Sequence, residues 1–528
     1  MNTKAEMNKK KYYVLPVNDK KGRIQCFIRT LDNPDSFIFD FSAAVCADDP
    51  AYFVYVDVTR FSGLNIMLTD RDGKEIPHTF HEGLPEVDKI ENGKFLRPLI
   101  HYTATTGWIN DPNGLIFADG KYHMFYQHNP MSVEWGNMHW GHAVSDDLFH
   151  WQDHGDELFP DETGLMFSGS AICDENNVAG FGAGAVILFY TAAPHGNELS
   201  IGRETSQCIA YSTDGGNTFT KYEKNPIIPH ITSLNRDPKV IYSDEIKKFI
   251  MALYLDAHTY ALFTSENLLD WEKFQEIEMP LDNECPDFYP LRVKNDGSVK
   301  WVLSGAHDTY IVGNLTKDGF KPIQENLKYS INPACRSYAA QTFSGIPNGR
   351  RIRIAWEHTK SDGAVFCSQM SLPCEMSLRN VDGVFRLSSE PIYEIRSLVK
   401  QFNNRIRLTD KGPFTVAVPK FFKDCAALAE LSMTEECAPF TISCFGEDIY
   451  VCPAENYFIH GGEKVQLSYT GKLQMRIIYD TLTSEVFADG GLIHSVMCMT
   501  ADRDKTMTVS TEAPLDLSIY IQALSLET

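Results

Sequence analysis

The sequence predicts an all-β protein: a five-bladed β-propeller, preceded by an additional all-β domain and followed by a β-sandwich. Short apolar runs bounded by Gly, Asn-Gly and Asp-Gly turn signals recur along the 528 residues, and aromatic residues, which favour strands, make up 12% of them. In the middle of the chain a unit of two strands also recurs five times. We therefore expect domains at residues 1–96, 97–397 and 398–528.

The first domain, residues 1–96, shows short strands and no cluster of acid-base residues. Residues 36–41 and 52–58 are rich in Phe, Tyr, Val and Ile, and the second run alternates in part between apolar and polar residues. Gly63 and Asp72-Gly73 mark turns between such runs. These features predict a small all-β domain.

The middle domain, residues 97–397, repeats a strand, a loop and a second apolar strand. The five units begin near Asp111, Ser168, Asp237, Glu284 and Tyr338, roughly 50 to 70 residues apart. Several strands per unit at this period are typical of propeller blades.

A second repeated element supports the blades. Segments that begin at Ser145, Ser212 and Ser265 each run from a Ser through Asp or Asn to an aromatic residue. We interpret them as one turn that is used in three blades.

The last domain, residues 398–528, again reads as all-β. Residues 465–469, 475–479 and 484–488 are strand-like, and an Asp-Gly-Gly turn follows at 489–491. A β-sandwich is the natural way to pack such strands. Cys437, Cys444 and Cys452 lie along these runs and are expected to be buried free thiols rather than metal ligands.

The repeat predicts a shared funnel. In a propeller the innermost strand of each blade lines a central channel. If the first strand of each unit is innermost, Asp111, Ser168, Asp237, Glu284 and Tyr338 all point toward that channel, so three carboxylates converge. Like charges held together favour protonation of at least one of them, which is the arrangement that glycoside hydrolysis uses.

Two other uses of these acids are weighed. In a propeller that only binds ligands, the acids would cap strand ends. In a metal site, they would hold a hard cation, but such cations take six or more oxygen ligands, and no further ligands cluster by spacing. We expect neither a metal nor another cofactor.

Charge and composition limit the partners. The formal net charge is −22, whereas nucleic acid and anionic membrane surfaces select a basic footprint. No run of about 18 apolar residues predicts a membrane span. Residues 1–13 lack the apolar core of a signal peptide, and the 13 cysteines show no disulfide pattern. We expect a cytoplasmic protein without nucleic-acid or membrane partners. Its oligomeric state stays open, a homodimer included.

Three short motifs contain the acids of the repeat: Trp108–Gly114, Arg236-Asp237-Pro238 and Glu284-Cys285. Three further motifs are Tyr126–Pro130, Trp135–His142 and Phe167–Ser170. The first three resemble the signature motifs of glycoside hydrolase family 32, the invertases, inulinases and levanases, and the other three are supporting matches. The resemblance starts near His101 and weakens in the C-terminal part.

The resemblance implies a five-bladed propeller, a C-terminal β-sandwich and a retaining mechanism on β-fructofuranosides. Asp111 would be the nucleophile, Glu284 the general acid and then the base, and Asp237 the stabiliser of the transition state. The residues that would line the fructose pocket are Asn110, Gln127, Trp135, Phe167, Ser168 and Arg236. The implied activity is exo-release of fructose from sucrose, fructo-oligosaccharides, inulin or levan.

Three departures from the family pattern stand out. The all-β stretch before Phe95 is longer than usual, residues 332–337 replace an expected Asp-x-Gly stretch, and residues 357–362 lack an aromatic-rich pattern. An endo-acting levanase or a fructosyltransferase of the same family is the alternative function. From another class, the alternative is a catalytically idle fructan-binding propeller.

Overall fold

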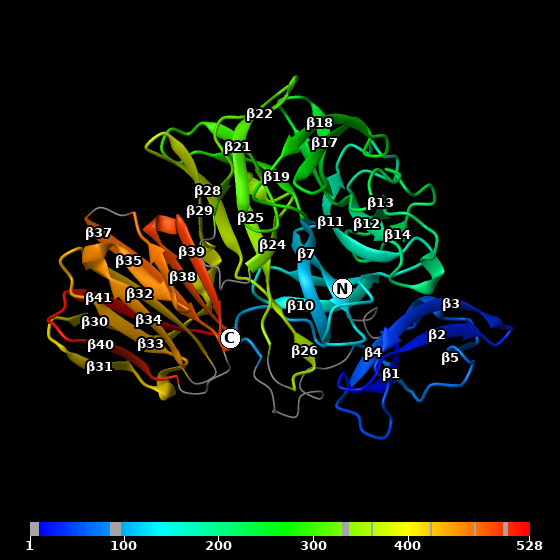
Figure 1. Ribbon diagram of the computed structural model, residues 1–528, viewed down its shortest axis with the longest axis horizontal. Helices are drawn as coiled ribbons and strands as arrows, with labels where there is room; N and C mark the ends of the chain where they lie inside the picture. Colours follow the sequence, from blue (N-terminus) through cyan, green and yellow to red (C-terminus); the bar gives the residue numbers. More distant parts are fainter. Residues whose placement is uncertain are drawn as a thin grey trace.

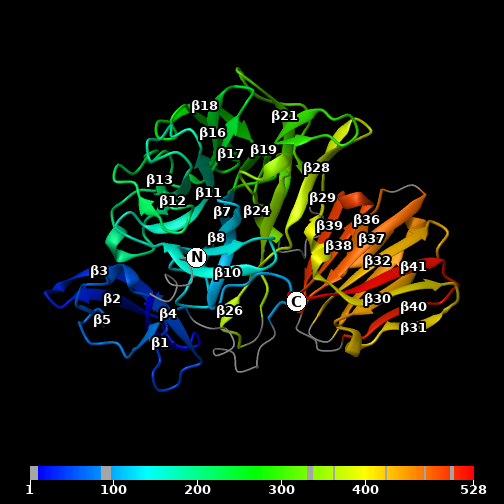
Figure 2. The same ribbon diagram turned by 180° about the vertical axis from the view of Figure 1, so that it is seen from behind.

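The computed structural model describes residues 10–84, 97–329, 337–360, 363–422, 425–468, 471–499 and 505–527. Regular structure in these residues is almost entirely β-strand, as predicted. Figures 1 and 2 show a central propeller with the N-terminal strands on one side and the C-terminal strands on the other. The described helical elements are short 3₁₀ turns: η1 (Thr59–Phe61), η2 (Glu198–Ser200), η3 (Pro347–Gly349), η4 (Tyr393–Leu398), η5 (Pro419–Phe422), η6 (Pro453–Glu455) and η7 (Asp489–Gly491).

Residues 10–84, called the N-terminal module below, form two three-stranded antiparallel sheets, ordered β4-β1-β6 and β3-β2-β5. Alternate residues such as Leu15, Val17, Val54 and Val56 fill a core of their own, as expected for strands with one buried face. The strands are β1 (Lys11–Val17), β2 (Ile24–Thr30), β3 (Asn33–Ala43), β4 (Tyr52–Asp57), β5 (Ile66–Thr69) and β6 (Thr79–Glu82).

Among the described residues, five successive sheets lie between residues 107 and 391, and each contains one of the repeat units found in the sequence. The first holds β7 (Gly107–Ala118), β8 (Lys121–Asn129), β9 (His139–Ser145), β10 (Trp151–Leu158) and β26 (Phe366–Cys367). The second holds β11 (Leu165–Asp174), β12 (Ala185–Ala193), β13 (Ser206–Ser212) and β14 (Thr220–Lys221). The third holds β15 (Arg236–Ser243), β16 (Lys248–Asp256), β17 (Thr259–Ser265) and β18 (Glu272–Glu278). The fourth holds β19 (Asp287–Arg292), β20 (Val299–Ser304), β21 (Thr309–Thr316), β22 (Gly319–Pro322) and β23 (Leu327–Lys328). The fifth holds β24 (Ser337–Thr342), β25 (Ile352–Glu357), β27 (Gln369–Met370), β28 (Cys374–Val381) and β29 (Val384–Pro391).

The first strands of these sheets form a closed ring. β7 contacts β11, β11 contacts β15, β15 contacts β19, β19 contacts β24, and β24 returns to β7. The first strand of each unit is therefore the innermost one, as the sequence predicts. The second strand of a sheet can be covered on both faces by the neighbouring sheets. In the second sheet, every residue of β12 is buried.

The three turns predicted to be equivalent share one hydrogen-bond pattern. The hydroxyl of Ser145, Ser212 or Ser265 accepts bonds of 2.8–3.3 Å from two backbone N–H groups that follow it. In two of these turns an indole N–H closes the loop, with Trp151 bonded to the carbonyl of residue 148 and Trp271 to that of residue 268. The repeated Ser and Asp or Asn positions thus exist because the side chains satisfy the turn backbone.

The C-terminal strands form a β-sandwich of two six-stranded sheets around one apolar core. Cys437, Cys444 and Cys452 are buried there, as predicted. One sheet contains β30 (Val399–Leu408), β32 (Ala426–Thr434), β37 (Lys472–Tyr479), β38 (Thr483–Ala488), β39 (Ile493–Cys498) and β41 (Leu517–Leu524). The other contains β31 (Gly412–Ala417), β33 (Phe440–Cys444), β34 (Glu447–Cys452), β35 (Tyr457–His460), β36 (Glu463–Gln466) and β40 (Met507–Thr511).

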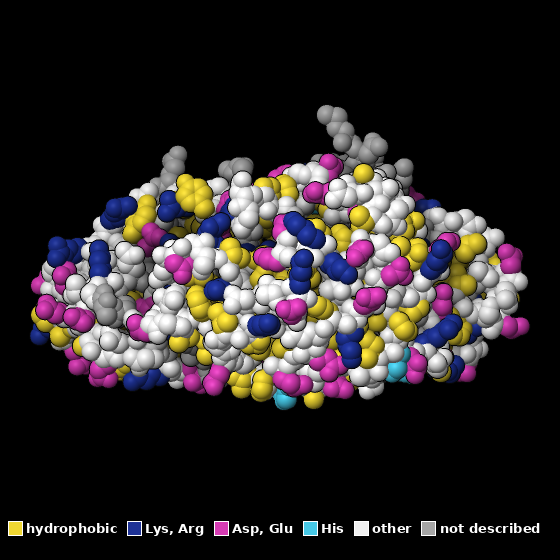
Figure 3. Space-filling model, turned by 90° about the horizontal axis from the view of Figure 1, so that it is seen from above, with side chains coloured by type: hydrophobic (Ala, Val, Ile, Leu, Met, Phe, Trp, Pro, Cys, Tyr) yellow, Lys and Arg dark blue, Asp and Glu magenta, His cyan; other side chains and the backbone are white. Residues whose placement is uncertain are grey.

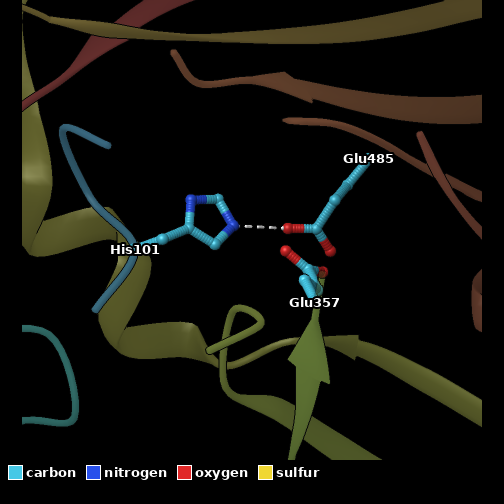
Figure 4. A group of neighbouring side chains, drawn as sticks. All are labelled: His101, Glu357 and Glu485. Atoms are coloured by element: carbon cyan, nitrogen blue, oxygen red, sulfur yellow. Dashed lines mark hydrogen bonds and ion pairs between the residues drawn. The ribbon is translucent and has the colours of Figure 1, made fainter. Parts of the chain in front are cut away.

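A buried polar cluster joins the sandwich to the propeller (Figure 4). His101, which precedes β7, bonds Glu485 of β38 through Nε2 at 2.8 Å and Asp480 through Nδ1 at 2.7 Å. Glu357, at the end of β25, lies beside Glu485. Burial alone would lower the pKa of His101, but its hydrogen bonds to the two carboxylates raise that pKa to about 10. His101 is therefore a buried cation that ties the two domains together.

The surface carries both signs of charge. On the face in Figure 3, acidic and basic side chains are interspersed with apolar ones. Within the described ranges, no helix has the length and apolar character needed to cross a membrane.

Candidate active site

Irregular pairing in the inner strands places the predicted site residues. The register between β7 and β8 skips Asn110 and Asp111, that between β11 and β12 skips Ser168, and that between β15 and β16 skips Asp237. A β-bulge re-aims the side chains of the residues that it leaves unpaired. The same irregularity at the same end of three neighbouring sheets therefore brings these side chains to one site.

Two of the three acids sit on unusual backbone. The φ angles are +66° at Asp237, +62° at Glu284 and +37° at Cys285. Residues other than Gly pay a steric cost of about 1–3 kcal/mol in such conformations, which persist where the surrounding structure enforces them. Here the Asp237 backbone N–H is held by Thr191 Oγ1 at 2.9 Å, and the Glu284 carbonyl accepts from Tyr260 Oη at 3.0 Å.

Asp111 is fixed through both carboxylate oxygens. Oδ2 accepts a 2.6 Å bond from the Ser168 hydroxyl and a 3.4 Å contact from the Cys285 thiol, and Oδ1 accepts a 3.1 Å bond from Asn110 Nδ2. Burial and the nearby Glu284 raise the pKa of Asp111, while the three donors oppose that rise. The carboxylate is thus held in one orientation and remains partly exposed to the funnel.

Asp237 lies deeper, with 2% of its surface exposed. Its Oδ2 accepts from the Cys285 backbone N–H at 3.0 Å and lies 3.5 Å from the Cys285 thiol and 3.7 Å from Arg236 Nε. Burial raises the pKa of Asp237 most strongly, Arg236 opposes this, and Asp111 adds to it, giving a value of about 7.

Glu284 lies at the mouth of the site, with a third of its side chain exposed. Its Oε1 pairs with Arg236 Nη2 at 3.0 Å, and its Oε2 accepts from the Tyr338 hydroxyl at 3.3 Å. Arg236 therefore contacts two of the three acids, and its guanidinium also lies 4.7 Å above the Tyr254 ring. This arginine therefore places a positive charge beside Asp237 and Glu284.

The other residues predicted to bind substrate surround these acids at different depths. Asn110 is buried and accepts from the Trp108 indole at 2.9 Å. Gln127 is also buried, and its amide bonds the Met166 carbonyl at 2.8 Å, so it supports the strand that carries Phe167 and Ser168. Trp135 is 53% exposed, and its ring centroid lies 6.1 Å from that of Phe167. Together they form one wall with an exposed aromatic rim.

Several residues of the site were not predicted from the sequence, among them Thr191, Tyr254 and Trp356. Thr191 of β12 contacts the Asp237 backbone, and Tyr254 of β16 contacts Arg236. Both residues reach the site through the pairing of their strands with the inner strands. The Trp356 ring lies 5.7 Å from Trp108 and 6.1 Å from Tyr338, so the inner strands of the first and fifth sheets share an aromatic wall. Of the unusual segment at 332–337, residues 332–336 lie outside the described residues, and Ser337 begins β24.

The model of the glycosyl hydrolases family 32 N-terminal domain matches residues 101–391, more than half of the chain, including all five propeller sheets and the three acids. The chain belongs to glycosyl hydrolase family 32. This confirms the family that the motifs resemble. The N-terminal module and the strands of the sandwich lie outside the matched range of this family 32 member.

Relatives of this family 32 chain include the levanase of Bacillus subtilis, 34% identical over 330 residues (57% of this chain, 48% of the levanase). The extracellular exo-inulinase of Aspergillus awamori is 32% identical over 343 residues, or 55% of this chain and 64% of the relative. The invertase of Schizosaccharomyces pombe is 32% identical over 355 residues, or 61% of this chain and 59% of the invertase. The chain thus spans about half to two thirds of these relatives' length.

Solved structures share the fold. The exo-inulinase from Aspergillus awamori superposes with a TM-score of 0.72 at 24% identity, covering 82% of this chain and 99% of that one. The β-fructofuranosidase from Schwanniomyces occidentalis gives 0.71 at 24% identity, covering 83% and 99%. The propeller and the sandwich of this family 32 member are therefore both found in known structures.

Proposed function

We propose that this protein is a retaining glycosidase that hydrolyses β-fructofuranosidic bonds and releases fructose from the end of sucrose, fructo-oligosaccharides, inulin or levan. The observation that carries the proposal is the bridge at Cys285. Its thiol contacts Asp111 and Asp237, and its neighbour Glu284 shares Arg236 with Asp237. Three carboxylates from three successive units thus lie close together, and a two-step glycoside hydrolysis needs two of them. The levanase, exo-inulinase and invertase names of the relatives support a fructoside as the substrate.

In the first step an oxygen of Asp111 attacks the anomeric carbon of the fructosyl unit. The bond from that carbon to the leaving oxygen breaks, and Glu284 gives its proton to the leaving oxygen. The bonds from Ser168 and Asn110 hold the Asp111 carboxylate in place before the reaction, so little reorganisation is needed during attack. A covalent fructosyl-enzyme results.

In the second step a water molecule attacks the same carbon. Glu284, now a carboxylate, takes a proton from that water, and the bond to Asp111 breaks. Two inversions give net retention. Glu284 suits both proton transfers because it lies at the exposed mouth of the site, where leaving group and water pass.

Asp237 and Arg236 complete the fructose pocket. The contacts of the Asp237 carboxylate within the described residues all fall on Oδ2, so Oδ1 is available to accept from a sugar hydroxyl. Such a bond strengthens as positive charge develops on the ring, which stabilises the transition state. Trp135 and Phe167 offer apolar faces to the sugar ring.

One incubation series tests this function. The protein is incubated with sucrose, inulin and levan, and the products are separated by chain length. Fructose as the first product supports the proposal. A ladder of oligomers identifies an endo-acting enzyme, and products longer than the substrate identify a transferase. Absence of product from every substrate, in a protein that binds them, identifies an idle fructan-binding propeller and refutes the proposal.

A further inference from the structure

The loop at residues 130–138, between β8 and β9, connects the candidate active site to the N-terminal module. At its tip, Trp135 faces Phe167, and the next residue after Phe167 is Ser168, which holds Asp111. At its base, Met131 is buried in the apolar core of the N-terminal module. The loop therefore spans the distance between a module without acid-base chemistry and the pocket.

Arg23 holds one side of the loop. Its Nη2 donates at 2.8 Å to the Ser132 hydroxyl and at 2.8 Å to the Glu134 carboxylate. The Ser132 hydroxyl in turn donates at 2.7 Å to Asp19. Ser132 is fully buried, so its hydrogen bonds to Arg23 and Asp19 are partly sheltered from water, whereas the pair of Arg23 with Glu134 lies at the surface.

Two further contacts fix the loop backbone. The Val133 N–H donates to the Tyr52 hydroxyl at 3.1 Å. On the other side of Trp135, the Asn137 side chain bonds the Ser42 backbone twice, accepting from its N–H at 2.9 Å and donating to its carbonyl at 2.9 Å. Asn137 itself has a φ of +43°, a conformation that this double bond holds in place.

A second set of contacts, through Asp40 and Arg71, joins the N-terminal module to the propeller. The buried Asp40 carboxylate accepts from the backbone N–H groups of Glu198 and Leu199, at 2.7 and 3.3 Å, at the start of η2, which connects β12 and β13 of the second sheet. Arg71 pairs with the Glu198 carboxylate. Two anchors on neighbouring sheets make the module a rigid support for the loop between them.

We propose that the N-terminal module is a positioning element for substrate binding. Through Arg23, Tyr52 and Ser42 it holds the loop at residues 130–138 so that Trp135 stands over the fructose pocket. This rests on the function proposed above. Without the module contacts, the loop would have to be ordered at the moment of binding, which costs conformational free energy and weakens binding of the substrate. Arg23 and Tyr52 are therefore positioning residues and not catalytic ones.

The test compares Arg23→Ala and Tyr52→Phe with Lys21→Ala, a matched control in the same module whose lysine pairs with Asp49 at the surface. Hydrogen–deuterium exchange of residues 129–138 is measured without substrate, and kcat and KM are measured on the fructoside that the wild type cleaves best. We expect faster exchange of the loop in both variants, and a KM raised about fivefold to tenfold with kcat within about twofold, because lost preorganisation weakens binding. Lys21→Ala should match the wild type.

A double variant separates positioning from general destabilisation. If Arg23 acts through Trp135, Arg23→Ala should add little to the KM of Trp135→Ala, because the two changes disturb one interaction. Unchanged loop exchange in both single variants would overturn the proposal, as would full additivity with Trp135→Ala. If the wild type cleaves no fructoside, the proposed function fails, whereas the exchange measurement still decides whether the module orders the loop.

Discussion

The Ser168 hydroxyl donates a 2.6 Å hydrogen bond to Asp111 Oδ2 across the boundary between two neighbouring propeller sheets. Both residues lie where the pairing register breaks, so the bond exists only because two bulges point at each other. A hydrogen bond to a carboxylate favours its ionised form, and in the proposed mechanism the ionised form of Asp111 is the nucleophile.

Ser168→Ala should therefore raise the pKa of Asp111 further. In the pH profile of kcat/KM, the rise on the acidic side should then move to higher pH, because Asp111 would keep its proton to a higher pH. At neutral pH we expect kcat/KM to fall about 10-fold to 100-fold, in line with a charged hydrogen bond of about 1.5–3 kcal/mol. The control is Ser170→Ala on the same strand, whose hydroxyl bonds the backbone of residues 238 and 240. An unmoved acid limb in Ser168→Ala would contradict the role given to this bond.

Asp237 provides a second pH signal. Its pKa of about 7 means that the free enzyme loses its proton from Asp237 as pH rises through that value. If the carboxylate accepts from a sugar hydroxyl, kcat/KM should increase with pH up to about 7. Asp237→Asn should remove this dependence and lower kcat/KM about 100-fold to 1,000-fold, as for the loss of one transition-state hydrogen bond. A variant with the wild-type pH profile would show that another group titrates.

The Cys285 thiol should be unreactive. Burial first, and then Asp111, Asp237 and Glu284, raise its pKa well above the usual value, so it stays a neutral S–H group. Folded protein treated with iodoacetamide at pH 7 should keep its activity, and peptide mapping should find Cys285 unmodified. Rapid alkylation of Cys285 with loss of activity would show that the thiolate is accessible.

His101 makes the free energy of unfolding depend on pH in the alkaline range. Because the folded state raises its pKa to about 10 from the ordinary value of 6.5, its contribution is complete below pH about 6.5 and is lost as pH rises through about 10. His101→Gln should lower the free energy of unfolding at pH 6.5 by about 3–5 kcal/mol, as expected when one partner of a buried ion pair is removed. Its denaturation midpoint should also vary less between neutral and alkaline pH. His150→Gln is the matched control, because that half-exposed histidine pairs with Asp147 at the surface. Equal pH dependence in His101→Gln and the wild type would refute this assignment.

The sequence predicts the features that depend on repetition. Equivalent positions in repeated units fold into equivalent places, so the inner strands and the turns at Ser145, Ser212 and Ser265 follow from the spacing alone. The convergence of Asp111 and Asp237 follows in the same way, and Cys285 contacts both.

Features that depend on contacts between distant segments could not be predicted. The positive φ angles at Asp237 and Glu284 arise from the surrounding contacts, and nothing in the residue types marks them. Likewise, nothing in the sequence around Arg23 distinguishes it from a surface arginine. Its partner Ser132 lies 109 residues further along the chain. Such contacts are set by how the module sits on the propeller, and a single sequence carries no local signal for that.

In the proposed mechanism Asp111 forms a covalent bond to the fructosyl unit, and that intermediate can be trapped. Glu284→Ala, incubated with a fructoside that bears an activated leaving group, should form the intermediate but resolve it slowly, because the base for water is missing. Intact-protein mass spectrometry should show one added fructosyl unit, and peptide mapping should place it on Asp111. An adduct on another residue, or consumption of the substrate with inversion and no adduct, would contradict the account.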